Sequence, residues 1–443
     1  MQQTILEACL PDGLLRSAVD LEHYLAEQRS PALAALGLPG DVVVPCHGIS
    51  IANLPATLAE ILGGKLLGAA APLPDAMWRD LATGVQRVVW FIVDALSWLD
   101  LRQLVEEGKA PTIGRLAEAG RLLPITSVLP STTTTALTTL WTGYTPAQHG
   151  LVGHMTYMHE FGLIGDLLSF SPAGVRMRDE LLERGLSLDE FLPVPGLAQA
   201  LLEQGIVTRA LINVDLAMTG FSRLSYRGVT ELERFVTPAD MCVRLREMLA
   251  AHPDERLLAA GYLAEIDSVG HLLGPGSEAW HAVLRSLAFS LQHEFLSQLS
   301  PELRKGTLLV LTSDHGQLSR PGRSVFLGDH PELQERLLLP LTGSLRAAYL
   351  YFRQGQLDAA ERYLRTELAE QFAVVRSGEA LEAGLFGPGR PAPEASRRLG
   401  DLVVLARDNY LLDYRRREQA PRGMHGGPSR CEMLSPLLMA RLD

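Results

Sequence analysis

Three apolar runs in the sequence each lead into an acidic residue, and this pattern limits the possible folds. Residues 87–94 are RVVWFIVD, residues 257–267 are LLAAGYLAEID and residues 307–314 are TLLVLTSD. Strands that are apolar on both faces are typical of parallel sheets with helices on either side. Ligands of such sheets bind beyond the carboxyl ends of the strands. The pattern predicts strands over 87–93, 257–266 and 307–312, with their acids at one sheet edge: Asp94, Asp267 and Asp314.

Helical patterns alternate with these strands, for example at 99–119, 134–141, 237–251 and 280–298. This alternation predicts an α/β fold with a mostly parallel central sheet and helices on both faces. We expect one domain over 1–443. Residues 1–86 are expected to be an N-terminal extension packed on it, with a short strand at 42–45. Residues 340–405 contain a separate series of strand and helix patterns and are predicted to be a small inserted α+β cap subdomain.

Charge and cysteine content narrow the class of protein. Lys and Arg number 40 and Asp and Glu 51, a net charge of −11 that would repel nucleic acids and anionic membranes. The cysteines form no CxxC pair, which argues against a disulfide framework and a cysteine zinc site. The N-terminus lacks an apolar signal-peptide core, and no apolar run reaches 18 residues. The expected location is therefore cytoplasmic.

Three histidines accompany the three acids. His271 follows Asp267 by four residues, His315 follows Asp314 directly, and His425 lies in the glycine-rich segment RGMHGG. The i, i+4 spacing puts Asp267 and His271 on one face of a helical turn. Three Asp and three His suit Zn²⁺ better than Mn²⁺ or Fe. Six ligands are too many for one tetrahedral ion, but they fit two metal ions with three protein ligands each.

A threonine run supplies the candidate nucleophile. Residues 130–136, PSTTTTA, follow a predicted strand and open a predicted helix. The N–H groups and the positive end of a helix attract phosphate. A threonine hydroxyl is a poor nucleophile in water, and a coordinated metal ion lowers its pKa. The same run also suits a plain helix cap, because Ser and Thr are favoured there.

Five segments, in this order, resemble the type I phosphodiesterase/nucleotide pyrophosphatase branch of the alkaline phosphatase superfamily. They are VVWFIVDAL, LPSTTTTALTTLWTGYTPAQHGLVGH, YLAEIDSVGH, LVLTSDHGQ and GMHGG, and they span residues from about 88 to 430. The resemblance implies an alkaline-phosphatase-like catalytic domain and a metal-dependent phosphohydrolase. The implied cofactors are two divalent metal ions, Zn²⁺ or alternatively Mn²⁺. One ion is expected on Asp267, His271 and His425, and the other on Asp94, Asp314 and His315.

The resemblance also implies a nucleophile that bridges toward the second ion and forms a phospho-threonine intermediate. Counting from Pro130 and from Thr142 gives Thr133, with Thr132 and Thr134 as the neighbouring alternatives. Thr134 and His154 are the expected substrate-binding residues. Ala136 stands where many relatives carry an asparagine that helps to hold a phosphate oxygen. The Thr133 and Thr134 N–H groups, or a side chain elsewhere, are expected to take its place.

The expected substrate is a small phosphate ester, with a phosphodiester or nucleotide pyrophosphate preferred. Neither nucleic acid nor membrane is expected as a partner, and a homodimer is compatible with the sequence. Two alternatives stay open: a phosphomonoesterase or phosphonate hydrolase on the same metal pair, and a non-catalytic sensor of a phosphate ligand. The full set of ligands argues against the sensor. The 340–405 unit lies between His315 and His425 in the sequence, so we expect it to overhang the site and shape substrate choice.

Overall fold

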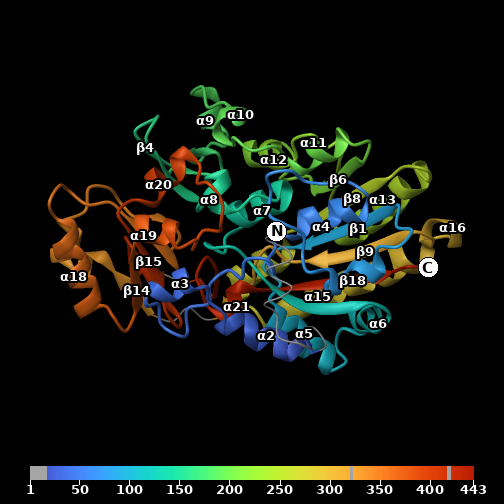
Figure 1. Cartoon of the computed structure of the whole chain (residues 1–443), viewed down its shortest axis with the longest axis horizontal. Coiled ribbons are helices and arrows are strands. Elements are labelled where there is room, and N and C mark those ends of the chain that lie inside the picture. The colour runs from blue at the N-terminus through green and yellow to red at the C-terminus, as the bar shows by residue number, and fades with distance from the viewer. Residues whose placement is uncertain (1–16, 320–322, 417–420) are drawn as a thin grey trace.

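The central sheet has seven strands and is parallel except for one. The computed structural model describes residues 17–319, 323–416 and 421–443 (Figure 1). The strand order is β2 (Arg121–Thr126), β18 (Leu434–Arg441), β9 (Thr307–Thr312), β1 (Arg87–Val93), β8 (Leu257–Leu263), β6 (Val207–Asn213) and β7 (Glu231–Phe235). Only β18 runs antiparallel to its neighbours. The predicted α/β fold with a mostly parallel sheet is confirmed.

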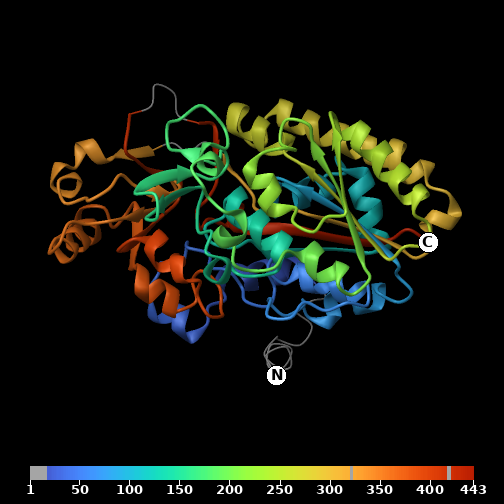
Figure 2. The same ribbon diagram turned by 90° about the horizontal axis from the view of Figure 1, so that it is seen from above.

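Strand β1 shows why both faces need helices. Val88, Trp90 and Ile92 pack into the hydrophobic core on one face, whereas Val89 and Phe91 belong to the core on the other. Full burial of such side chains stabilises a fold by about 1.5–3 kcal/mol each. The first core takes helices α2 (Ala18–Glu27), α4 (Leu54–Ile61), α7 (Thr133–Thr142), α11 (Leu197–Leu202) and α12 (Gly220–Ser225). The second takes α5 (Trp98–Glu106), α6 (Pro111–Ala119), α13 (Pro238–Ala251) and α15 (Glu278–Ser290), of which α13 and α15 are the yellow-green and yellow helices in Figure 2.

Residues 17–86 pack against the same core. Leu21 and Leu25 of α2 and Leu58 of α4 are fully buried beside the strand side chains. The expected strand at 42–45 is wrong: these residues are buried but form no strand. The Val43 N–H donates a backbone hydrogen bond to Pro428 O, which lies in a loop and not in a neighbouring strand, so the segment is not part of a sheet.

A second sheet of seven strands is antiparallel and lies beside the first. Its order is β14 (Phe372–Arg376), β15 (Leu402–Ala406), β13 (Ala347–Leu350), β12 (Thr342–Gly343), β3 (Met155–Met158), β4 (Leu163–Asp166) and β5 (Ser171–Pro172). Helices α18 (Leu357–Glu367), α19 (Ser377–Glu382) and α20 (Pro393–Leu399) accompany it. The expected 340–405 unit therefore shares its sheet with residues 155–172. Its role as a cap stays a prediction.

Shorter elements connect these layers. They are α3 (Pro31–Ala35), α8 (Pro146–His149), α9 (Glu180–Glu183), α10 (Leu188–Phe191), α14 (Glu265–Leu273), α16 (Pro301–Arg304), α17 (Pro331–Gln334), α21 (Arg430–Met433), and the strand pairs β10 (Leu318–Ser319) with β17 (Gly423–Met424) and β11 (Arg323–Phe326) with β16 (Tyr410–Asp413). In the described ranges, none of the helices has the length and apolar character needed to cross a membrane.

One strand end differs from the sequence expectation. β8 stops at Leu263 rather than Ile266, and α14 begins at Glu265. Asp267 therefore lies in the first turn of a helix and not directly after a strand. Because His271 follows Asp267 by four residues, α14 places both side chains on the same helix face, and both can reach the site.

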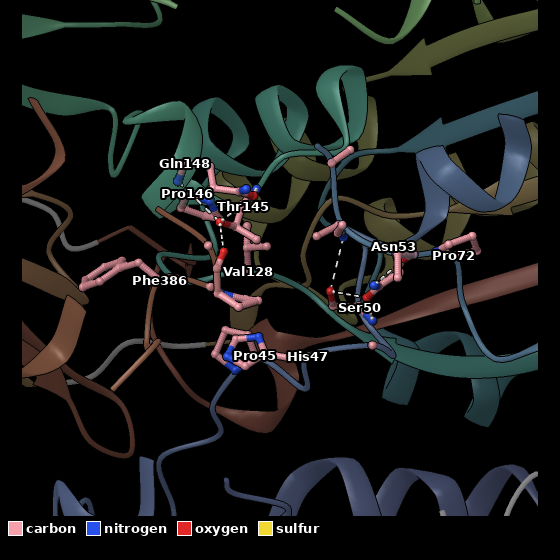
Figure 3. Close-up of a pocket in the computed structure, with 18 of the residues that line it drawn as sticks. Pro45, His47, Ser50, Asn53, Pro72, Val128, Thr145, Pro146, Gln148 and Phe386 are labelled. Atoms are coloured by element: carbon pink, nitrogen blue, oxygen red, sulfur yellow. Dashed lines mark hydrogen bonds between the residues drawn. The ribbon is translucent and has the colours of Figure 1, made fainter. Parts of the chain in front are cut away.

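A cavity of about 520 Å³ lies between the 45–53 segment, α8 and the turn at 386–389 (Figure 3). Its described lining contains no Asp, Glu, Lys or Arg and none of the residues predicted for the site. Burial lowers the pKa of His47, which lines it, so this imidazole is neutral. The cavity is therefore separate from the acidic cluster.

Candidate active site

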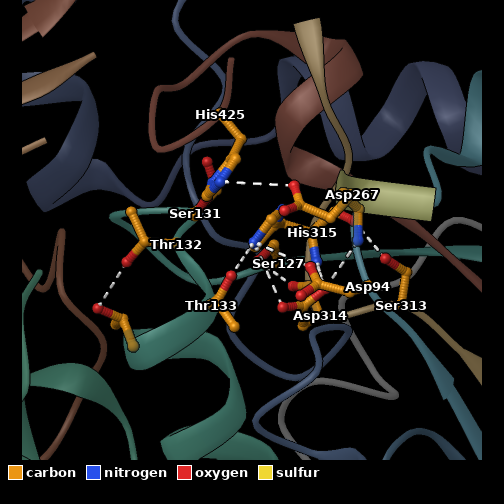
Figure 4. Close-up of polar contacts among 12 residues, drawn as sticks. Asp94, Ser127, Ser131, Thr132, Thr133, Asp267, Ser313, Asp314, His315 and His425 are labelled. Carbon is orange, nitrogen blue, oxygen red and sulfur yellow. Dashed lines mark hydrogen bonds and ion pairs between the residues drawn. The ribbon is translucent and has the colours of Figure 1, made fainter. Parts of the chain in front are cut away.

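The seven residues predicted as nucleophile and metal ligands come together at the carboxyl edge of the central sheet, and Figure 4 labels all of them except His271. Asp94 follows β1, Asp314 and His315 follow β9, and Thr133 is the first residue of α7. Asp267 and His271 come from α14, and His425 comes directly after β17. Strands and helices from five distant stretches of the chain thus converge, as the parallel arrangement leads one to expect.

The first group consists of Asp94, Asp314 and His315, all of them buried. His315 Nε2 lies 3.3 Å from Asp314 Oδ2 and 3.6 Å from Asp94 Oδ1. The other oxygen of Asp314 accepts hydrogen bonds from the backbone N–H groups of Ala95, at 3.1 Å, and His315, at 2.9 Å. The three ligand atoms therefore point toward a common position.

The second group consists of Asp267, His271 and His425 and is more accessible. Asp267 Oδ1 lies 3.3 Å from His271 Nε2 and 3.7 Å from His425 Nε2. The rings of His425 and His315 stack with centroids 4.0 Å apart and an interplanar angle of 14°. This stacking places the two groups next to each other.

Backbone carbonyls fix the orientation of all three histidines. Nδ1 lies 2.8 Å from Gly423 O in His271, 3.0 Å from Gly316 O in His315 and 3.0 Å from Ser131 O in His425. A carbonyl only accepts, so Nδ1 carries a hydrogen in each ring. In a neutral ring the Nε2 lone pair then faces the carboxylates, whereas in a protonated ring Nε2 donates to them. This arrangement is typical of metal-binding histidines.

The electrostatics also fit metal ions. Asp94 Oδ1 and Asp314 Oδ2 are buried and have no hydrogen-bond partner among the described residues. Burial, aided by neighbouring carboxylates, raises the pKa of Asp94 well above its usual range, and burial raises that of Asp314 to about 7. Burial also opposes ionisation of Asp267, but the hydrogen bond from His271 and the nearby imidazoles lower its pKa overall. Buried, unpartnered carboxylates beside oriented imidazoles are the donor set that a divalent cation stabilises.

Two supporting side chains were missed by the sequence analysis. The buried Tyr262 donates a short hydrogen bond to Asp94 Oδ2, and Gln317 Nε2 donates to Asp267 Oδ1 at 3.0 Å. Gly270 makes room for Gln317, because a Cβ there would lie 1.7 Å from Gln317 Oε1. The position of Gln317 directly after Asp-His-Gly in the motif LVLTSDHGQ could have identified it as a site residue. The apolar pattern of β8, in contrast, does not distinguish Tyr262 from a core residue.

The threonine run lies as predicted at a helix start. The Thr133 hydroxyl is 3.3 Å from His315 Nε2 and is partly exposed. Thr132 Oγ1 instead donates to Thr135 Oγ1, and the Thr134 hydroxyl is buried without a partner among the described residues. Of the three alternatives, Thr133 is the one that faces the acidic cluster.

The remaining histidines lie outside both groups. His154 lies just before β3, where its carbonyl accepts from Leu167 N–H, and its expected substrate contact stays a prediction. His149 is buried and bonded to Thr139, and burial lowers its pKa to about 3, as suits a structural residue. His159 contacts Glu160 and Glu394 at 3.2 Å, with Arg397 on its other nitrogen. An arginine and two carboxylates satisfy that ring without a metal ion.

The raised carboxyl pKa values predict how pH affects the metal-free protein. A carboxyl group whose pKa is higher in the folded than in the unfolded chain stabilises the fold while protonated, and the contribution is lost as pH rises through the folded value. For Asp314 that window runs from 3.8 to about 7. We expect the Tm of chelator-treated protein, measured by calorimetry, to fall over this window. In Asp314→Asn the fall of Tm with pH should be smaller. An equally steep fall in this variant would contradict the assignment of the effect to Asp314.

Comparison with known proteins is consistent with this geometry. Residues 88–164 and 209–428, about two thirds of the chain, match the type I phosphodiesterase/nucleotide pyrophosphatase family. Similar solved structures include murine ectonucleotide pyrophosphatase/phosphodiesterase 5, with a TM-score of 0.62 and 18% identity, and its inactive threonine-to-alanine variant in complex with AMP, with 0.60 and 17%. Both matches cover 80% of this chain and 87% of the other.

Phosphonoacetate hydrolase from Sinorhizobium meliloti, in complex with phosphonoformate, is similar with a TM-score of 0.59 and 18% identity, covering 80% of this chain and 89% of the hydrolase. At such identities the structures show the shared fold, and the family match carries the assignment. The chain belongs to the type I phosphodiesterase/nucleotide pyrophosphatase family and is a phosphoric ester hydrolase.

Proposed function

We propose that the protein is a phosphodiesterase of the nucleotide pyrophosphatase type, with two zinc ions and Thr133 as nucleophile. One observation carries the proposal. Two compact Asp/His groups, joined by the stacked rings of His315 and His425, lie beside a threonine hydroxyl at the start of α7.

The ligand sets follow from the two groups. Asp94, Asp314 and His315 would hold one ion, and Asp267, His271 and His425 the other. Mixed oxygen and nitrogen ligands favour Zn²⁺, with Mn²⁺ as the alternative. Bound there, the pair would lower the pKa of the Thr133 hydroxyl and neutralise charge on the attacking and leaving oxygens.

The chain's own groups then position the substrate. Thr133 Oγ1 is aimed at the cluster. Its attack on the phosphorus of a diester would break the bond to one alcohol, which leaves with the threonine proton, and the second alcohol would stay on phosphorus in the phospho-threonine intermediate. Water would then hydrolyse the bond to Thr133 and release the monoester. The first N–H groups of a helix lack acceptors within the helix and would bind the phosphate oxygens. The Ala136 side chain is fully buried in the core, so it leaves this task to the N–H groups of Thr133 and Thr134.

The similar structures support this choice in two ways. A threonine-to-alanine variant of the murine ectonucleotide protein is inactive and binds AMP. By analogy, we infer a threonine-dependent reaction on nucleotide-like esters. The phosphonoacetate hydrolase supports the second candidate, a phosphonate hydrolase on the same pair of ions.

The test compares three substrates with zinc-loaded protein: bis(p-nitrophenyl) phosphate, p-nitrophenyl phosphate and phosphonoacetate. We expect kcat/KM for the diester to exceed that for the monoester at least about tenfold, a difference of about 1.4 kcal/mol in transition-state binding. A preference for the monoester would indicate a phosphomonoesterase with the same active site, and a preference for phosphonoacetate would indicate a phosphonate hydrolase. No turnover of any of the three would contradict the proposed function.

A further inference from the structure

A fully buried ion pair joins the second sheet to the segment that follows His425. Arg346 directly precedes β13, and Glu432 lies in α21, just before β18 of the central sheet. Arg346 Nε donates to Glu432 Oε1 at 3.0 Å, and Arg346 Nη2 donates to Oε2 at 2.7 Å. Both side chains have an exposed fraction of 0%. The pair is therefore bidentate and shielded from water.

Stability alone does not explain such a pair. Removing two charges from water is costly, and apolar residues of similar volume often stabilise a core equally well or better. What distinguishes this pair is how many further groups it binds. Glu432 also accepts from Gly427 N at 2.8 Å, from Ser429 N at 3.2 Å and from Ser429 Oγ at 2.5 Å. Arg346 Nη1 donates to Tyr410 O at 2.6 Å.

The groups that Glu432 binds belong to the loop that carries His425. Gly427 O in turn accepts from Ser131 Oγ at 2.7 Å, and Ser131 O accepts from His425 Nδ1. The chain of contacts thus runs from the buried carboxylate through Gly427 and Ser131 to the imidazole. Ser131 lies two residues before Thr133, so the threonine loop shares this support.

The backbone of α21 contacts the loop of the other group as well. Gly316 N–H, next to His315, donates to Glu432 O at 2.9 Å. A Cβ at Gly316 would lie 1.9 Å from Cys431 O, so the approach requires glycine. One short helix therefore contacts the loops of both ligand groups, through the Glu432 side chain at the His425 loop and through a backbone carbonyl at the His315 loop.

We propose that Glu432 and Arg346 are positioning residues that hold His425 against Asp267, so that the second sheet sets the metal affinity of the Asp267–His271–His425 group. This inference rests on the proposed function, because it assumes that the group binds a metal ion. Loss of the pair releases Gly427 and Ser429, and His425 then loses its fixed distance from Asp267. The Asp94–Asp314–His315 group keeps its own contacts with Ala95 and Tyr262.

The experiment is a calorimetric Zn²⁺ titration of the metal-free protein comprising residues 1–443. The wild type should bind two ions, and His425→Ala identifies which affinity belongs to the second group. Arg346→Met and Glu432→Gln should weaken that affinity at least tenfold and leave the other within threefold. Arg346→Lys keeps the charge without the bidentate geometry and should recover part of the loss.

Arg398→Met is the matched control. Arg398 is also a buried arginine beside the second sheet, and it donates to Gly150 O at 2.8 Å rather than to the His425 loop. This variant should lower Tm and leave both affinities unchanged. If the single variants fail to fold, Arg346→Met with Glu432→Met replaces the pair by apolar groups and should still lose the second affinity.

The outcomes separate the two proposals. A wild type that does not bind two ions would overturn the proposed function, and the inference with it. A wild type that binds two, together with pair variants that keep both affinities, would overturn the inference alone. Equal loss in Arg398→Met would also overturn it, since the effect would then be one of general stability.

Discussion

Replacing Thr133 by alanine is expected to lower kcat for a phosphodiester by about 10³-fold or more while both metal ions stay bound. The substitution removes the hydroxyl that lies 3.3 Å from His315 Nε2, and it leaves all six Asp and His ligands in place. Removal of a catalytic nucleophile has effects of this size or larger. The measurement is kcat for bis(p-nitrophenyl) phosphate together with metal content by atomic emission.

Neighbouring threonines supply the controls. Thr134→Val replaces a buried hydroxyl by a methyl group of similar shape, and Thr132→Ala removes a hydroxyl bonded only to Thr135 in the described contacts. Both variants should keep most of the activity, and Thr133→Ser should recover part of it. Full activity in Thr133→Ala, or a complete loss in Thr132→Ala instead, would show that the nucleophile is assigned to the wrong residue.

Removing the metal ions is expected to abolish turnover and to lower thermal stability. Without a cation, the buried oxygens of Asp94 and Asp314 have no partner among the described residues, and Asp267 adds a third carboxylate to the cluster. Free zinc at a thousand times its Kd should stabilise the folded chain by about 4 kcal/mol for each site, which raises Tm by several degrees. Activity and Tm are measured before chelation, after it, and after zinc is restored.

The Asp94→Asn variant is the control for this prediction. It should bind one ion fewer and show a smaller rise of Tm with zinc. Unchanged activity in the chelated protein would contradict a metal-dependent reaction. A Tm that does not respond to zinc would contradict binding at the buried carboxylates.

The sequence predicts the parts of this protein that depend on local pattern. The strand at Thr307–Thr312 has the expected bounds, and the acids of three strand regions converge because parallel strands bring their carboxyl ends to one edge. The grouping of Asp94 with Asp314 and His315, and of Asp267 with His271 and His425, was implied by the family resemblance. The structure shows the same two clusters.

What the sequence did not predict depends on contacts between distant segments. β18 contains Pro436, whose missing N–H argues against a strand, yet it pairs between β2 and β9. The second sheet pairs Gly343 with Met155, a partner that no local pattern specifies. The support that Tyr262, Gln317 and Glu432 give to the site likewise depends on which loops the fold brings near them.

Trapping the covalent intermediate would show whether Thr133 is the nucleophile. Zinc-loaded protein is mixed with bis(p-nitrophenyl) phosphate, quenched with acid during turnover and mapped by peptide mass spectrometry. We expect a p-nitrophenyl-phosphoryl adduct on Thr133, because only one p-nitrophenol leaves in the first step, and this adduct should be absent from Thr133→Ala and from unreacted protein. Turnover at full rate with no adduct on any residue of the 130–136 segment, under conditions that trap the adduct of a control phosphatase, would contradict a threonine nucleophile.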